Sequence, residues 1–199
     1  MAYSDTLCAS WPDKLVSTRV MKHRIILCVI LIGITGQAWA CKCASDPGPV
    51  KEEFKGSGLV IYGKVVSKTL VAPSKTIKEN KVNEVRERLK EDKQKLAFFD
   101  TDYIFEVKIK VIEKFKGAYP GDTVTIYTAM KSASCGYAFE TGKAYIIYAL
   151  KRCYMDFAFL TESDRNKNLE KENTYWTTHC SRTAEYSKHE ADELRAIKN

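Results

Sequence analysis

The sequence predicts a mainly β protein: a small closed barrel of five strands, with a helical insertion between the first two strands and a C-terminal helix. Three observations predict this class. Five short stretches rich in β-branched and aromatic residues lie between residues 58 and 180. Turns and loops separate them, which favours a small barrel over a parallel sheet. The length of 199 residues suits one modest domain.

The five predicted strands follow one another along the chain. The first, 58–67, alternates and is rich in β-branched residues. The second, 101–115, places alternate apolar residues from Tyr103 to Val111 on one face. A Pro-Gly pair then predicts a turn at 119–122. The remaining predicted strands are 123–129, 142–150 and 174–180.

Two stretches depart from the strand pattern. Residues 75–99 carry apolar residues at helical spacing, with eight basic and five acidic residues between positions 75 and 95. They are interpreted either as a helical insertion lying on the barrel or as a partner-binding arm. Residues 187–199 predict a C-terminal helix with Ala191, Leu194 and Ile197 facing inward.

The N-terminal region has the three parts of a secretory signal. Lys22 and Arg24 precede an apolar run, and Ala38-Trp39-Ala40 forms a small-x-small cleavage site. The apolar run is too short for a membrane span. We therefore expect residues 1–40 to be removed and the secreted protein to begin at Cys41. The true start is either Met1 or Met21.

The cysteines beyond this cleavage site predict disulfides, as is usual in a secreted protein. Cys135 and Cys180 each lie next to a predicted strand and are natural partners for the Cys41-Lys42-Cys43 sequence. Because Cys153 brings the total to five, one cysteine is left unpaired or pairs between molecules. A metal–thiolate site is disfavoured because no second ligand pair lies at zinc-finger spacing.

Composition argues against several functions. The formal net charge of +7 is too diffuse to indicate nucleic-acid binding, although it suits anionic glycans. Beyond residue 40 the histidines are His179 and His189, which lack metal-ligand spacing. A catalytic pair of Cys153 with His179 is conceivable but has no further support. We therefore expect neither an enzyme nor a cofactor of its own.

Several motifs together carry a family resemblance. They are the Cys-x-Cys after the signal, LVIYGKVV, YIFEVKIKVIEKFKG, SCGYAFETGKAYIIYA and THCSRT. From Cys41 to about Tyr186 the chain resembles a netrin-like domain, most closely the N-terminal domain of the tissue inhibitors of metalloproteinases. The resemblance implies a five-stranded OB-fold barrel over residues 41–186. It also implies disulfides Cys41–Cys135 and Cys43–Cys180, with Cys153 unpaired.

The resemblance further implies a secreted inhibitor of zinc metalloproteinases. The free amine and carbonyl of Cys41 would chelate the zinc of the target protease and displace its bound water. An α-amine with a pKa of about 7.7–8.0 is partly neutral at physiological pH and can donate its lone pair. Lys42 would enter the specificity pocket. The target-contact residues implied by the resemblance are Cys41, Lys42, Cys43, Ala44, Ser45, Ser132, Ala133 and Ser134.

Two alternatives stay open. One is a non-inhibitory netrin-like module that binds extracellular matrix or heparin-like glycans, which the positive charge and the basic 75–99 region would suit. The other is a lipid anchor on Cys41, which would consume the amine that inhibition needs. Ala38 stands where a lipid-anchoring signal usually has leucine, and this disfavours the anchor.

Overall fold

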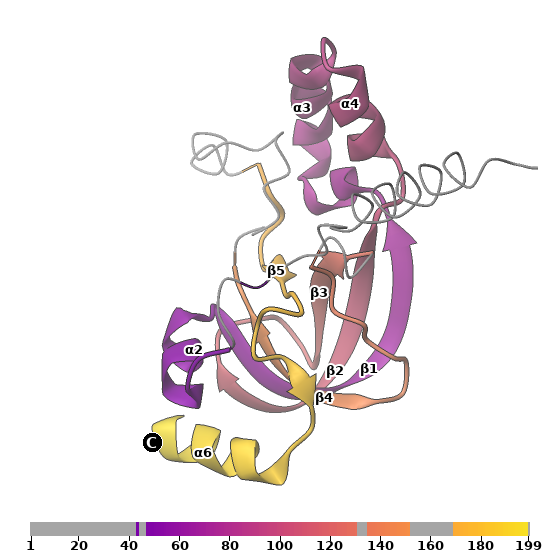
Figure 1. Ribbon diagram of the computed structural model, residues 1–199. Coiled ribbons are helices and arrows are strands. Elements are labelled where there is room, and N and C mark those ends of the chain that lie inside the picture. The colour runs from indigo at the N-terminus through magenta and orange to yellow at the C-terminus, as the bar shows by residue number, and fades with distance from the viewer. Residues whose placement is uncertain (1–42, 44–46, 131–134, 152–168, 199) are drawn as a thin grey trace, which may run out of the picture. The chain divides into compact units, whose positions relative to one another are not determined.

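The computed structural model describes residues 43, 47–130, 135–151 and 169–198 (Figure 1). The predicted signal at 1–40 lies outside these residues. Among the described residues, no helix combines the length and the apolar character needed to cross a membrane.

One six-stranded, curled sheet forms the centre of the fold. Its strands are β1 (Leu59–Val71), β2 (Ile104–Lys116), β3 (Thr123–Ala129), β4 (Ala144–Ala149), β5 (Tyr175–Trp176) and β6 (Ala184–Glu185). Their order in the sheet is β5-β3-β2-β1-β4-β6. All pairs are antiparallel except β3 with β5. The five predicted strands are confirmed, and β6 is an additional two-residue strand.

Trp176 joins the two edges of the curled sheet. Trp176 in β5 pairs with Tyr127 of β3. It also exchanges two backbone hydrogen bonds of 2.8 Å with Leu150, which follows β4. The barrel is therefore closed through β5, as in the OB-type arrangement that the resemblance implies.

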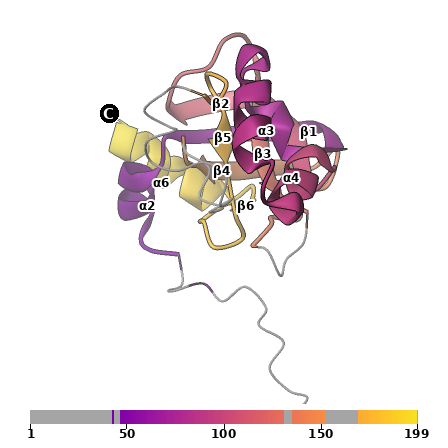
Figure 2. The same ribbon diagram turned by 90° about the horizontal axis from the view of Figure 1, so that it is seen from above.

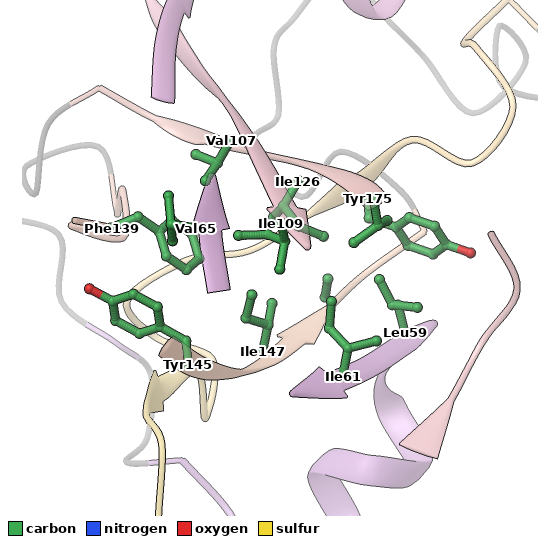
Figure 3. Packing of buried hydrophobic residues seen from close by; sticks show 12 residues of the cluster. Leu59, Ile61, Val65, Val107, Ile109, Ile126, Phe139, Tyr145, Ile147 and Tyr175 are labelled. Atoms are coloured by element: carbon green, nitrogen blue, oxygen red, sulfur yellow. The ribbon is translucent and has the colours of Figure 1, made fainter. Parts of the chain in front are cut away.

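The barrel interior is filled by apolar residues from five strands (Figure 3). Val107 and Ile109 of β2 point inward, as the alternation predicts, and both are fully buried. Gly63 in β1 lies against β2 at a shift in register. A Cβ atom there would lie 2.8 Å from the Lys110 carbonyl oxygen and closer still to the Ile109 side chain. Glycine is thus required for this close approach.

Two helices cover part of the outer face of the sheet. Helices α2 (Val50–Gly56) and α6 (Lys188–Lys198) lie side by side (Figure 2). They pack against Val60, Phe115, Ile146 and Tyr148. Helix α6 confirms the predicted C-terminal helix: Ala191 and Leu194 are buried, and Ile197 packs against the same cluster. Helix α2 was not predicted.

The region between β1 and β2 is helical, as predicted. It consists of η1 (Pro73–Thr76), η2 (Glu79–Lys81), α3 (Val82–Leu89) and α4 (Lys93–Asp100). Asp92 separates the two α-helices and caps α4 by accepting a 3.0 Å hydrogen bond from the Lys95 amide. A separate small core holds these elements together: Ile77, Val85, Leu89, Phe99 and Leu169. We call residues 73–100 the insertion.

Candidate functional site

A disulfide joins the beginning of the described chain to the region near its end. Cys43 and Cys180 are bonded, with 5.4 Å between their Cα atoms, and they lie 137 positions apart in the sequence. This is the pairing that the resemblance implies for the two residues. Cys43 is thereby held against the segment that follows β5.

Cys180 sits in a turn that its own neighbours fix. The Thr178 hydroxyl oxygen accepts hydrogen bonds from the amides of Cys180 (2.9 Å) and Ser181 (3.1 Å). The Ser181 hydroxyl donates back to the Thr178 carbonyl at 2.7 Å. Such local bonds from hydroxyl side chains favour turns over strands. The predicted strand 174–180 therefore ends after Trp176.

Buried hydroxyl groups tie this turn to β4. The Thr177 hydroxyl donates to the Tyr148 carbonyl at 2.9 Å, and the Thr183 hydroxyl accepts from the Tyr148 amide at 3.0 Å. The two hydroxyl oxygens are 2.8 Å apart. Because both threonines are buried, these bonds are shielded from water and rigidify the turn.

Cys135 meets the same turn from another part of the chain. Its carbonyl accepts a 3.1 Å hydrogen bond from the His179 amide. Cys135 is disulfide-bonded. Since Cys43 and Cys180 are bonded to each other, the partner of Cys135 lies outside the described residues. The pair Cys41–Cys135 stays a prediction. We call Cys43, Cys135 and residues 178–181 the Cys180 edge.

A histidine accompanies the disulfide. The His179 Nε2 atom is 3.7 Å from the Cys180 sulfur, and ligand atoms of Cys43, His179 and Cys180 lie within 4.8 Å of one another. Both sulfurs are in the disulfide, so neither is the thiolate that a metal would need. The Cys180 edge is therefore a crosslinked surface and not a metal centre.

A pocket of about 320 Å³ lies beside the disulfide. Helix α2 forms one side and residues 176–181 the other. Trp176 and Leu150 provide apolar walls, and Glu52 and Glu53 provide carboxylates. The sequence did not indicate this pocket, because α2 was not predicted.

Most of the predicted target-contact residues lie outside the described part of the chain. These are Cys41, Lys42, Ala44, Ser45, Ser132, Ala133 and Ser134, together with the cysteine predicted to be unpaired, Cys153. The structure does place the residues that flank them. Cys43 and Cys135 both lie at the 178–181 turn.

Sequence reasoning missed the hydroxyl side chains that build this turn. Thr177, Thr178, Ser181 and Thr183 were not singled out. A signal was present, because TTHCSRT at 177–183 places four hydroxyl residues around one cysteine. Such a run favours local turns and can satisfy buried polar groups.

Comparison with known proteins bears on this arrangement. Residues 39–157 match the protein-family model described as tissue inhibitor of metalloproteinase. The match covers more than half of the chain and includes Cys43, Cys135 and strands β1 to β4. A search of curated proteins finds no match. The closed barrel and the Cys43–Cys180 disulfide agree with this family match. The chain belongs to the tissue inhibitor of metalloproteinase family.

Proposed function

We propose that this chain is a secreted inhibitor of zinc metalloproteinases that binds the target's zinc through Cys41. Family membership supports the inhibitory role. The observation that carries the mechanism is the Cys43–Cys180 disulfide, because it anchors the chain two residues after the proposed chelating group. Cys41 becomes the first residue when the signal is cleaved after Ala40.

The chemistry follows from the free terminus. The amine and carbonyl of Cys41 form a five-membered chelate on the zinc and replace the water that the protease uses. The turn at 178–181 is fixed by its own hydrogen bonds before any target arrives. A terminus held by this turn loses less conformational entropy on binding than a free one.

Lys42 points to the kind of protease that is inhibited. Its ammonium group would lose hydration on entering an apolar pocket, at a substantial cost in binding free energy. We therefore propose a target whose specificity pocket is acidic or open to solvent. A Lys42→Ser variant should shift inhibition toward proteases with apolar pockets, measured as a change in the ratio of inhibition constants.

The zinc-chelation mechanism is tested by moving the N-terminal amine away from Cys41. One alanine added before Cys41 displaces the amine by one residue and should abolish inhibition. One alanine added after Asn199 is the matched control and should inhibit like the wild type. N-terminal sequencing of the secreted proteins confirms that Cys41, or the added alanine, is first. Full inhibition by the N-terminal variant would overturn the zinc-chelation mechanism.

Glycan binding is a second candidate function, which three lysines of the barrel favour. Exposed Lys64 of β1 lies directly opposite exposed Lys110 of β2, and Lys108 lies two residues away on the same face. These three lysines make no ion pair within the described part of the chain. Like charges placed opposite each other destabilise a sheet, so their presence suits an anionic ligand.

The insertion suits this role less than its composition suggests. Four of its basic residues pair with its own carboxylates: Lys81–Glu84 (3.0 Å), Arg86–Asp100 (2.9 Å), Lys90–Glu87 (3.5 Å) and Lys95–Asp92 (3.3 Å). We therefore propose the β1–β2 face as the glycan-binding site.

A K64Q/K110Q variant should elute from immobilised heparin at lower salt, because it releases fewer counterions on binding. The control K81Q/K90Q, in the insertion, should elute like the wild type. Equal shifts in both variants would remove the β1–β2 face as the site.

A further inference from the structure

The segment between the disulfide and α2 is held at its backbone by charged side chains. The Gly48 carbonyl accepts a 2.9 Å hydrogen bond from Arg182 Nη1. The Gly48 amide donates to Glu53 Oε1 at 3.2 Å. Both polar groups of this one residue are thus paired with ionised side chains. Gly48 lies five residues after Cys43, so the chain is fastened twice within a short distance.

Arg182 is itself held by the C-terminal helix. Its Nε donates to Glu190 Oε1 of α6 at 2.9 Å, and the Tyr148 hydroxyl donates to the same oxygen at 2.7 Å. The Arg182 and Glu190 side chains are 29% and 13% exposed, which limits screening by water. Burial and the hydrogen bond to the Glu190 carboxylate raise the pKa of Tyr148.

The geometry requires arginine. Nε and Nη1 of one planar guanidinium reach acceptors on two separate segments, Glu190 on α6 and Gly48 before α2. A lysine offers a single nitrogen on a flexible stem and cannot reproduce this fork. Helix α2 begins after Pro49 with no side-chain cap. The arginine bond to Gly48 fixes the backbone that leads into this helix.

We propose that Arg182 and Glu190 are positioning residues for the target-binding terminus. They fasten the chain at Gly48 while the Cys43–Cys180 disulfide fastens it at Cys43, so the anchor of the proposed terminus is held at two points. This inference rests on the proposed inhibitory function. Both residues lie beyond the family match at 39–157, and the proposal gives this C-terminal region a part in inhibition.

The test compares two arginine variants of similar chemistry. R182Q removes the bond to Gly48. R195Q removes an ion pair of α6 with Glu113, at 2.6 Å, that does not reach the N-terminal segment. Amide hydrogen exchange of residues 48–54, the melting temperature and the inhibition constant are measured for both. R182K keeps the charge but cannot bond Glu190 and Gly48 together, so it should resemble R182Q.

We expect R182Q to speed exchange at residues 48–54 and to weaken inhibition, each by about tenfold, because the terminus must be ordered on binding. R195Q should leave both unchanged, even where its melting temperature falls as much as that of R182Q. Wild-type exchange rates in R182Q, or equal loss of inhibition in R195Q, would overturn the positioning role.

The two proposals fail in different ways. Hydrogen exchange needs no protease and therefore tests the fastening of Gly48 by itself. Faster exchange in R182Q together with no inhibition by the wild-type protein would overturn the proposed function and leave the fastening in place. Unchanged exchange would overturn the fastening whatever the inhibition data show.

Discussion

The Cys180 edge and the insertion are both well packed, but contacts of very different range hold them. The disulfide at the edge joins residues 137 positions apart, and the Arg182–Gly48 bond next to the edge joins residues 134 positions apart. In the insertion, Lys81 pairs with Glu84 and Arg86 with Asp100, which are 3 and 14 residues away. The edge therefore depends on the whole fold, whereas the insertion is held by short-range ion pairs and by one distant segment, residues 169–171, which supplies Leu169 to its core.

Removing the long-range disulfide should have the largest effect. In C43S/C180S the unfolded chain regains the entropy of a 137-residue separation, which lowers the free energy of unfolding by about 5 kcal/mol in the chain-entropy model. The terminus also loses its anchor, so inhibition should disappear. Denaturant unfolding and inhibition assays measure the two effects. Undiminished inhibition in the folded variant would show that the edge does not need this crosslink.

Damage to the insertion core should cost nearly as much stability without the loss of function. Phe99 is fully buried against Val85 and Leu89. F99A should destabilise the insertion by about 3–5 kcal/mol through lost packing and the cavity left behind. Inhibition, measured where the barrel is folded, should match the wild type. Weaker inhibition would support the alternative interpretation of this region as a partner-binding arm.

A smaller effect is expected at Gly63, where β1 and β2 approach closely. In G63A the new methyl group meets the Lys110 carbonyl, so the strands must shift, at a cost of about 1–3 kcal/mol in unfolding free energy. The control is G56A, at a helical position with no atom within 4 Å of the added Cβ. Thermal unfolding measures both. If G63A is as stable as G56A, strands β1 and β2 can move apart to accommodate the methyl group. The barrel would then depend less on close contacts between distant segments than the comparison with the insertion implies.

The smallest effect concerns the pH dependence of α4. The Lys95 amide lowers the pKa of Asp92 by donating to its carboxylate. The cap therefore stabilises α4 above the unfolded-state pKa of about 3.9, and the stabilisation is lost as the pH falls through the lower folded-state value. D92N keeps an acceptor that does not titrate. The protection factor of the Lys95 amide, which corrects for the intrinsic pH dependence of exchange, should fall at acidic pH in the wild type and fall less in D92N, with β2 unaffected in both.

The sequence predicts the long elements better than the short ones. Residues 123–129 match β3, and the alternation in 101–115 identifies the buried face of β2. Strand β6 has two residues and exists only because Ala184 and Glu185 pair with β4. Helix α2 has seven residues between a Pro-Gly-Pro sequence and Ser57, too few to establish a period. Its stability comes from packing on α6 and the sheet, which a local pattern does not contain.

The candidate site also has a part that the sequence predicts and a part that it does not. The cysteines are visible in the sequence, and the observed Cys43–Cys180 pairing is the one that the family resemblance implies. The bonds of Thr183 to Tyr148 and of Arg182 to Gly48 join residues 35 and 134 positions apart. Threonine and arginine occur at many surfaces, so nothing local marks these two as partners of a distant backbone. Only the fold brings them together.

The span of the Cys43–Cys180 disulfide also orders events during biosynthesis. Cys43 is made early, but its partner is synthesised 137 residues later. At about 5–20 residues per second, this delay is roughly 7–27 s. Throughout that interval the thiol of Cys43 has no native partner. It can form a wrong disulfide with a cysteine that is synthesised before Cys180. A cellular disulfide isomerase is therefore expected to determine how much correctly crosslinked protein forms.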